Sequence, residues 1–203
     1  VWVATLMSAP INCVTTLASA HISSLKALQG KTVGYAGSVL GPIFLSHMLA
    51  KAGLSLKDIT LVNVNMSLSE ALLSKKVSAV FGMSRNVEPV ALEASGHAVR
   101  LFLPEHYGIT AHDAFYIVAN KNKTSLTLRT AFQKGFAKGM HQSITQPHKA
   151  WRIATKAYPD ALAPNAKEAA LNKAIWKDTW PMLSPHPLVF NKAAYDQLIL
   201  LAK

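Results

Sequence analysis

Residues 31–103 alternate short apolar strands with amphipathic helices, and this alternation limits the fold more than any other feature of the sequence. The expected strands are KTVGYAG (31–37), ITLVNV (59–64), VSAVFGM (77–83), which Gly82 interrupts near its end, and AVRLFL (98–103). The expected helices are IFLSHMLAKAG (43–53), SLSEALLSKK (67–76), which Ser67 and Glu70 open as a capping box, and NVEPVALEASG (86–96). Strands joined by helices at this spacing predict βαβ units, and hence an α/β fold with a largely parallel sheet.

The pattern changes after one further strand, AFYIVAN (114–120), because helices and turns follow it to the end of the chain. We therefore expect an α/β lobe over residues 14–113 and a second, helix-rich lobe formed by residues 1–13 and 114–203. In this arrangement residues 1–13 pair with residues near 114–120 as the two strands of a hinge.

Composition excludes several classes of protein. Half of the residues are hydrophobic and 15% are charged, which predicts a real core and argues against wholesale disorder. No apolar run reaches the length of about 18 residues that a membrane-spanning helix needs. Cys13 is the single cysteine, so one chain can form neither a disulfide nor a thiolate metal cage, and we expect Cys13 to be a small core residue.

The net charge of +11 is unevenly distributed, with +2 in residues 1–120 and +9 in residues 121–203. A basic half can bind nucleic acid or an anionic surface. The lysines are dispersed, however, and no aromatic RNA-binding signature accompanies them, so solvated helix faces are the favoured interpretation. We expect no nucleic-acid partner.

The chain begins VWVATLMS, with neither a methionine nor a polar leader, and this segment is typical of a strand already under way. It shows no charged n-region and no A-x-A cleavage site of a signal peptide. We therefore expect the natural N-terminus to lie upstream of this chain, in a segment that could hold part of a binding site.

Several segments within residues 1–150 resemble the second lobe of periplasmic solute-binding proteins of ABC importers. The matching segments are LQGKTVGY, AGLSLKDITLVNVN, ALLSKKVSAVFG, RNVEPVALE and PEHYGITAHDAFYIVANK. Within that group they are most similar to the branch that binds pyrimidine precursors of thiamine, which is related to the alkanesulfonate, nitrate and taurine binders and to the fungal pyrimidine-precursor synthase.

The resemblance implies a type II periplasmic-binding-protein-like fold with one complete α/β lobe and a helix-rich remnant of the other, whose first α/β segment is absent. It implies a periplasmic, non-catalytic component of an ABC importer that grips an aminopyrimidine in an interlobe cleft and serves the importer's membrane subunits. The alternatives are a binder of alkanesulfonate, nitrate or taurine, and the effector-binding domain of a transcription regulator. A synthase of the same fold would need a cysteine cluster and iron, whereas this sequence has only Cys13.

Candidate ligand-binding residues follow the expected strands, because the crevice of an open α/β sheet lies at the carboxyl ends of its strands. They are Gly37, Ser38, Asn65, Arg85, Asn86, Glu88 and Tyr107. Gly37 and Ser38 form either a tight turn or a cradle of backbone N–H groups. Asn65 either faces the ligand or helps Ser67 to cap the next helix, which is the favoured interpretation. Tyr107 could stack on a ring.

Glu88 is the most informative of these residues. Its carboxylate could accept hydrogen bonds from the exocyclic amine and from a protonated ring nitrogen of an aminopyrimidine. The resemblance places a ligand-facing acid at this position. The alternative is a helix first-turn acid with Arg85 as its surface partner, an effect worth about 0.3–1 kcal/mol.

No other motif indicates catalysis or a metal. Glu105, His106 and His112 share one loop, but their spacing matches no standard metal site, and they are interpreted as polar loop residues. No G-x-S-x-G nucleophile elbow is present. We expect no cofactor and no metal, and we expect the tryptophans at 151, 176 and 180 to be core residues.

Overall fold

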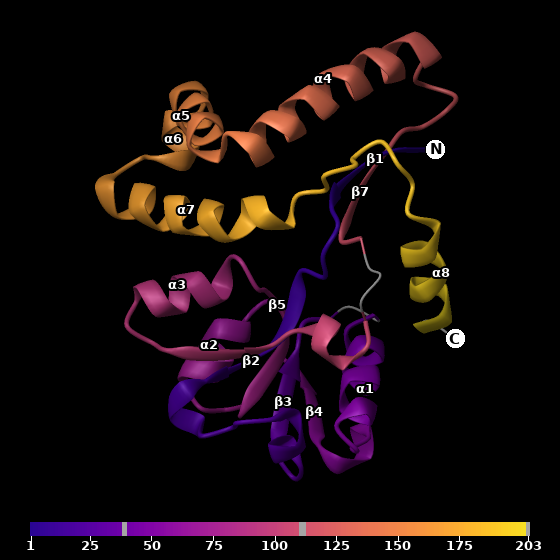
Figure 1. The fold of residues 1–203 in the computed structure, drawn as a ribbon. Helices are drawn as coiled ribbons and strands as arrows, with labels where there is room; N and C mark the ends of the chain where they lie inside the picture. The colour runs from indigo at the N-terminus through magenta and orange to yellow at the C-terminus, as the bar shows by residue number, and fades with distance from the viewer. Residues whose placement is uncertain (38–39, 110–112, 202–203) are drawn as a thin grey trace. The chain divides into compact units, whose positions relative to one another are not determined.

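The computed structural model describes residues 1–37, 40–109 and 113–201, which form two units (Figure 1). The sheet unit comprises Pro10–Ala111 and Asp196–Lys203, and the hairpin–helix unit comprises Val1–Ala9 and His112–Tyr195. The expected boundary between residues 13 and 14 falls inside a strand, and the chain instead changes unit between Ala9 and Pro10. The end of the chain from Asp196, expected in the helix-rich lobe, groups with the sheet unit, where Leu198 packs against the core.

The sheet unit contains five strands in the order β4-β3-β5-β2-β6. The strands are β2 (Asn12–Leu17), β3 (Thr32–Tyr35), β4 (Thr60–Asn63), β5 (Ala79–Ser84) and β6 (Val99–Phe102), and the helices are α1 (Leu40–Lys51), α2 (Leu68–Leu73) and α3 (Glu88–Ala94). The sheet is mixed rather than largely parallel: β3 pairs in parallel with β4 and β5, while β2 is antiparallel to both β5 and β6. Sequence analysis missed β2 because it assigned Asn12 and Cys13 to the hinge, although both residues pair with β5.

Helices cover both faces of this sheet, with α1 on one side of the strands and α2 on the other (Figure 1). The first core cluster joins α1 to one face through Leu45, Met48 and Phe81. The second cluster lies under α2 and α3 and contains Val80 and Met83. The apolar stripe of each helix is therefore buried against the sheet, which holds the strand ends in fixed positions.

Strand β5 has a β-bulge at Gly82 near its end. The strand is therefore not broken at Gly82 but continues to Ser84. Cys13 pairs with Met83 and Val14 pairs with Phe81, which leaves Gly82 without a partner on β2. Gly82 has φ +116°, a conformation that other residues rarely adopt. Because the extra residue shifts the alternation of side chains, Met83 lies in the same cluster as Val80 instead of that of Phe81.

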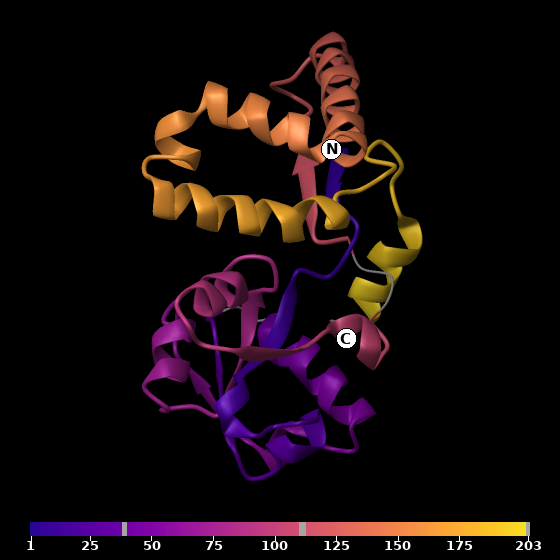
Figure 2. The same ribbon diagram turned by 60° about the vertical axis from the view of Figure 1, so that its left-hand side comes forward.

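The hairpin–helix unit begins with β1 (Trp2–Met7) paired antiparallel with β7 (Phe115–Val118), which confirms the predicted pairing of these two segments. The helices that follow are α4 (Leu126–Thr145), α5 (Pro147–Ala157), α6 (Pro159–Leu162), α7 (Ala166–Thr179) and α8 (Lys192–Leu201), whose residues from Asp196 onward group with the sheet unit. In both views α5 and α7 lie side by side (Figures 1 and 2), and the Trp176 indole N–H donates to the Pro147 carbonyl at 3.0 Å. The three tryptophans expected in the core are half-buried, and the lysines of these helices are exposed, as predicted.

A buried carboxyl group ties the hairpin to the segment before α8. Asp113 is 3% exposed and accepts hydrogen bonds from the Thr5 hydroxyl and from the Asn191 amide, both at 3.5 Å. Both bonds are long, so they compensate only in part for the loss of water. Burial therefore raises the pKa of Asp113, and the two hydrogen bonds oppose that shift.

This pKa shift predicts a pH dependence of stability that Asp113→Asn removes. As pH rises above about 3.9, the unfolded wild-type chain loses this proton before the folded chain does, so the contribution of Asp113 to stability falls until the raised folded-state pKa is passed. Asn does not titrate. We expect the stability of Asp113→Asn relative to wild type to increase with pH over this window and then to level off. Urea unfolding at a series of pH values from 3 to 7 measures it, and a constant or decreasing difference would contradict the assignment.

Candidate functional site

The strand order brings polar residues together along one edge of the sheet. β3, β4, β5 and β6 all end at this edge, and the antiparallel strand β2 begins there. Gly37, Asn65, Arg85 and Glu105 follow these four strands, each within three residues of the strand's last residue. The edge is therefore the place where side chains from separate βα connections can converge on one ligand.

Gly37 and Asn65 lie next to each other at this edge. A Cβ atom at Gly37 would lie 3.4 Å from the Asn63 side-chain nitrogen and 3.7 Å from the Asn65 side-chain oxygen. Asn65 has φ +52°, and its backbone N–H donates to Asn63 Oδ1 at 2.8 Å. The backbone can thus approach a ligand closely here. Ser38, the neighbouring candidate, lies outside the described residues.

The favoured capping role of Asn65 and Ser67 is wrong. Ser67 precedes α2 but makes no side-chain hydrogen bond to its first turn, and the capping box with Glu70 is not formed. Its backbone angles, φ −89° and ψ 43°, are not the extended values that place a capping oxygen over the helix. The exposed Asn65 amide makes no hydrogen bond to the described residues through its side chain, so it is available at the sheet edge.

Glu88 is held at the start of α3 by its own connection. The Ser84 backbone N–H donates to Glu88 Oε2 at 2.8 Å. Glu88 Oε1 makes no hydrogen bond to the described part of the chain and is not among its buried side-chain oxygens without a partner, so it is accessible. One oxygen of this carboxylate is thus anchored, and the other is available to a ligand.

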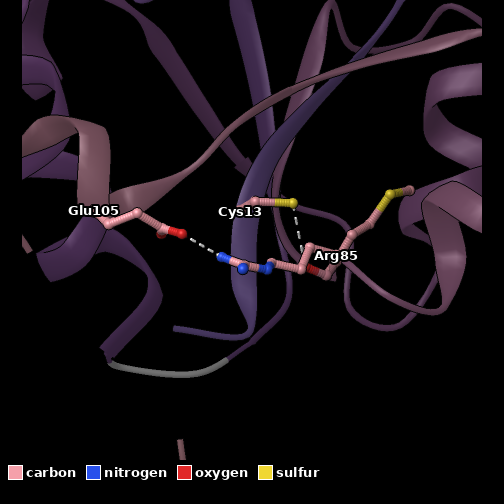
Figure 3. Close-up of polar contacts among 4 residues, drawn as sticks. Cys13, Arg85 and Glu105 are labelled. Atoms are coloured by element: carbon pink, nitrogen blue, oxygen red, sulfur yellow. Dashed lines mark hydrogen bonds and ion pairs between the residues drawn. The ribbon is translucent and has the colours of Figure 1, made fainter. Parts of the chain in front are cut away.

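Arg85 pairs with Glu105, which contradicts the alternative interpretation of Arg85 as the surface partner of Glu88. Arg85 Nη1 lies 2.5 Å from Glu105 Oε1, and the two side chains are only 19% and 27% exposed (Figure 3). The Arg85 backbone N–H donates to the Ile11 carbonyl at 2.9 Å, which fixes the turn after β5. Asn86, the next candidate, is buried. The turn after β5 therefore holds a partly buried ion pair and a buried amide instead of exposed surface side chains.

Glu105 belongs to this group although sequence analysis assigned it to a polar loop. It lies in the short 3₁₀ turn Pro104–Tyr107 that follows β6. Its Oε2 is buried and accepts no hydrogen bond from any described residue. The position of Glu105 after a strand was a usable signal in the sequence, but its ion pair with Arg85 was not, because the two residues are twenty positions apart.

Cys13 lies on β2, within electrostatic range of these charges. Its thiol is 0% exposed, lies 3.4 Å from Thr15 Oγ1 and donates to the Met83 carbonyl at 3.7 Å (Figure 3). Burial raises the pKa of Cys13 to about 11, the Thr15 hydroxyl and Arg85 oppose this shift, and Glu88 and Glu105 add to it. Arg85, Glu88 and Glu105, one cation and two carboxylates, thus all lie within electrostatic range of Cys13 at this edge of the sheet. The expectation that Cys13 is a small core residue is confirmed.

Tyr107 is not brought to this cluster by its described contacts. It packs, partly buried, against the first core cluster on the α1 side of the sheet, and this burial raises the pKa of its hydroxyl. The next residue, Gly108, lies close to the side chain of Lys51 at the last turn of α1. The part of the chain that the structure describes holds no group of three His, Cys, Asp or Glu side chains that could bind a metal ion. Among the same residues, no helix is long and apolar enough to cross a membrane.

A family model described as NMT1/THI5 like matches residues 1–150. The chain belongs to the NMT1/THI5-like family. A relative from Haemophilus influenzae, named as a thiamine biosynthesis protein, is 38% identical over 196 residues and covers 97% of this chain. The formylaminopyrimidine-binding protein of Halalkalibacterium halodurans is 29% identical over 153 residues and covers 74% of this chain. The chain spans 61% and 46% of the lengths of these two relatives.

The fold of this NMT1/THI5-like protein is periplasmic-binding-protein-like. The alkanesulfonate-binding protein SsuA from Xanthomonas axonopodis pv. citri superposes with a TM-score of 0.67 at 16% identity, covering 99% of this chain and 68% of its own. At this identity the likeness shows the fold alone. Other solved neighbours include a periplasmic sulphonate-binding protein, so the structural neighbours are solute-binding proteins of the ABC-transporter type.

Proposed function

We propose that this NMT1/THI5-like protein is the substrate-binding component of an ABC importer and that its ligand is an aminopyrimidine precursor of thiamine. The family match and the formylaminopyrimidine-binding relative support this class of ligand. The fold supports a non-catalytic, periplasmic role in which the protein delivers its ligand to the importer's membrane subunits.

The observation that carries the proposal is the acidic cluster at the sheet edge. Glu88 Oε1 is accessible while Oε2 is anchored by the Ser84 backbone. The cluster of Arg85, Glu88 and Glu105 has one positive and two negative charges. An aminopyrimidine presents amine hydrogens and a ring nitrogen that can be protonated, which suits carboxylate acceptors. An alkanesulfonate presents only acceptor oxygens and a negative charge, which this cluster repels.

Replacing Glu88 by Gln is expected to weaken binding of a formylaminopyrimidine by at least about tenfold, or about 1.4 kcal/mol. The amide of Gln removes the negative charge and replaces one acceptor by a donor. Its carbonyl oxygen can still accept the Ser84 N–H, so the fold should be retained. Isothermal titration calorimetry of the natural protein and its variant measures the change.

Glu93→Gln is the matched control, because Glu93 is exposed on the same helix, α3. We expect this control to bind with wild-type affinity. Unchanged affinity in Glu88→Gln would remove Glu88 from the site. A wild-type protein that prefers an alkanesulfonate to the aminopyrimidine would overturn the proposed ligand.

A further inference from the structure

Two exposed asparagine side chains meet at the carboxyl ends of β3 and β4. Asn63 is the last residue of β4, and Asn65 follows it after one residue. A Cβ atom at Gly37 would lie 3.4 Å from Asn63 Nδ2 and 3.7 Å from Asn65 Oδ1. A ligand atom in the space that this glycine leaves would therefore contact both amides at ordinary distances. Asn63 was not among the candidate residues predicted from the sequence.

A backbone hydrogen bond fixes the orientation of the Asn63 amide. The Asn65 backbone N–H donates to Asn63 Oδ1 at 2.8 Å. Only the oxygen of a side-chain amide accepts from an N–H, so this bond identifies which end of the group is the nitrogen. Nδ2 is then the end nearest to Gly37, and it donates to no residue that the structure describes. The bond thus holds an accessible donor in place without using it.

The Asn65 side chain adds an acceptor beside this donor, because its own amide makes no hydrogen bond to the described residues. Both amides are neutral, in contrast to the ion pair in the turn after β5. The next residue, Met66, is 86% exposed, and its thioether can pack on an aromatic ring. This part of the sheet edge therefore offers a fixed donor, an acceptor and apolar surface to a ring compound.

A formylamino group has the acceptor and the donor that such a pair of amides recognises. Its carbonyl oxygen accepts a hydrogen bond and its N–H donates one, whereas removal of the formyl group takes the carbonyl acceptor away. The Asn63 donor would then be covered by the ligand without a partner, and a polar group left unpaired in this way is unfavourable. Glu88 cannot replace this donor, because a carboxylate only accepts.

We infer that Asn63 is a specificity-determining residue of the proposed site, with its Nδ2 donating to the formyl oxygen of the ligand. Asn65 Oδ1 lies beside it to accept the formylamino N–H. This inference rests on the proposed function and narrows it, since the protein then selects the formylated pyrimidine over the same compound without its formyl group. The two side chains recognise different parts of one ligand: Glu88 the amine and ring nitrogen, and Asn63 the formyl group.

Replacing Asn63 by Asp in the natural protein tests this assignment. Aspartate has nearly the same shape, keeps an oxygen for the Asn65 N–H and removes the donor. Isothermal titration calorimetry with a formylaminopyrimidine and with its deformylated counterpart measures the two affinities. We expect affinity for the formylated compound to fall at least about tenfold, whereas affinity for the deformylated compound should not fall.

Two further variants separate the lost donor from the added charge. Asn63→Ser is neutral, and its hydroxyl can still accept the Asn65 N–H but is too short to replace Nδ2. We expect the same selective loss, with affinity for the deformylated compound changing less than about threefold. Asn120→Asp is the matched control, because the exposed Asn120 accepts the Asn122 N–H at 3.0 Å in the same kind of turn in the hairpin–helix unit. It adds the same charge outside the sheet unit and should leave both affinities unchanged.

The outcomes distinguish this inference from the proposed function. If the natural protein binds neither compound, both fail. If it binds the formylated compound and Glu88→Gln weakens that binding, but Asn63→Asp and Asn63→Ser leave it unchanged, the proposed function stands and this inference is overturned. Equal losses of affinity for the two compounds would also overturn it, because Asn63 would then only support the turn after β4.

Discussion

The thiol of Cys13 is expected to react with a disulfide reagent at pH 8 at least about a hundredfold more slowly in the folded protein than in the denatured chain. Burial raises its pKa from 9.0 to about 11, and this lowers the thiolate fraction at pH 8 by about two orders of magnitude. The side chain is also 0% exposed, so the reagent has no direct access to it. The release of the chromophoric thiol by the reagent, followed with and without urea, measures both rates.

Cys13 is the only cysteine, so the signal has a single source and a Cys13→Ser variant supplies the blank. The result bears on function because a nucleophilic or redox role would need an accessible, activated thiolate. Native reactivity within about tenfold of the denatured rate would contradict the buried assignment. It would also reopen an enzymatic interpretation, which the resemblance to a synthase raises and the lone cysteine argues against.

Replacing Gly82 by Ala is expected to destabilise the protein by about 1–3 kcal/mol, because alanine must adopt a backbone conformation that only glycine adopts easily. The φ of Gly82 is +116°. Space is not the obstacle, since an added Cβ would meet Ala36 and Leu68 at ordinary distances of 3.7 and 3.8 Å. Urea unfolding measures the loss. The bulge sets the direction in which the side chains after it point, including Arg85 and Glu88 of the proposed site. Ligand affinity should therefore fall as well.

Gly41→Ala is the control for this prediction and should have the opposite sign. Gly41 lies in α1 of the same unit, and an added Cβ would be at least 3.7 Å from its nearest neighbour. Alanine is favoured over glycine in a helix by up to about 1 kcal/mol, so this variant should be as stable as wild type or more stable. If both alanines had the same effect on stability, the bulge would not need a glycine.

Much of the sheet unit could be predicted from the sequence because the relevant signals are local. Apolar alternation and helical spacing identified the strands now called β3, β4, β5 and β6, and each boundary lay within about three residues of its place in the structure. The rule that ligands bind beyond the carboxyl ends of such strands then led to Gly37, Asn65, Arg85 and Glu88 without knowledge of any contact.

The interactions within the site could not be predicted in this way. Pairing of Arg85 with Glu105, rather than with Glu88, depends on β2 lying between β5 and β6, and hence on strand order. The failure of Ser67 to cap α2 depends on backbone angles that the S-x-x-E pattern does not fix. Tyr107 packs against the core cluster beside α1, where its ring is partly buried. The residues next to it in the sequence give no signal of this packing.

The sequence by itself determined that this chain has an α/β unit with polar residues after its strands, and its motifs placed it in a family. Only the tertiary structure decided that β2 enters the sheet antiparallel, that a bulge at Gly82 turns the end of β5, and that Glu105 joins the cluster with an unused oxygen. The physical reason is the separation along the sequence of the residues that carry each signal. Helix and strand periodicity is written within a few residues, whereas strand order, register and the partners of a buried charge are set by contacts between residues far apart in the chain.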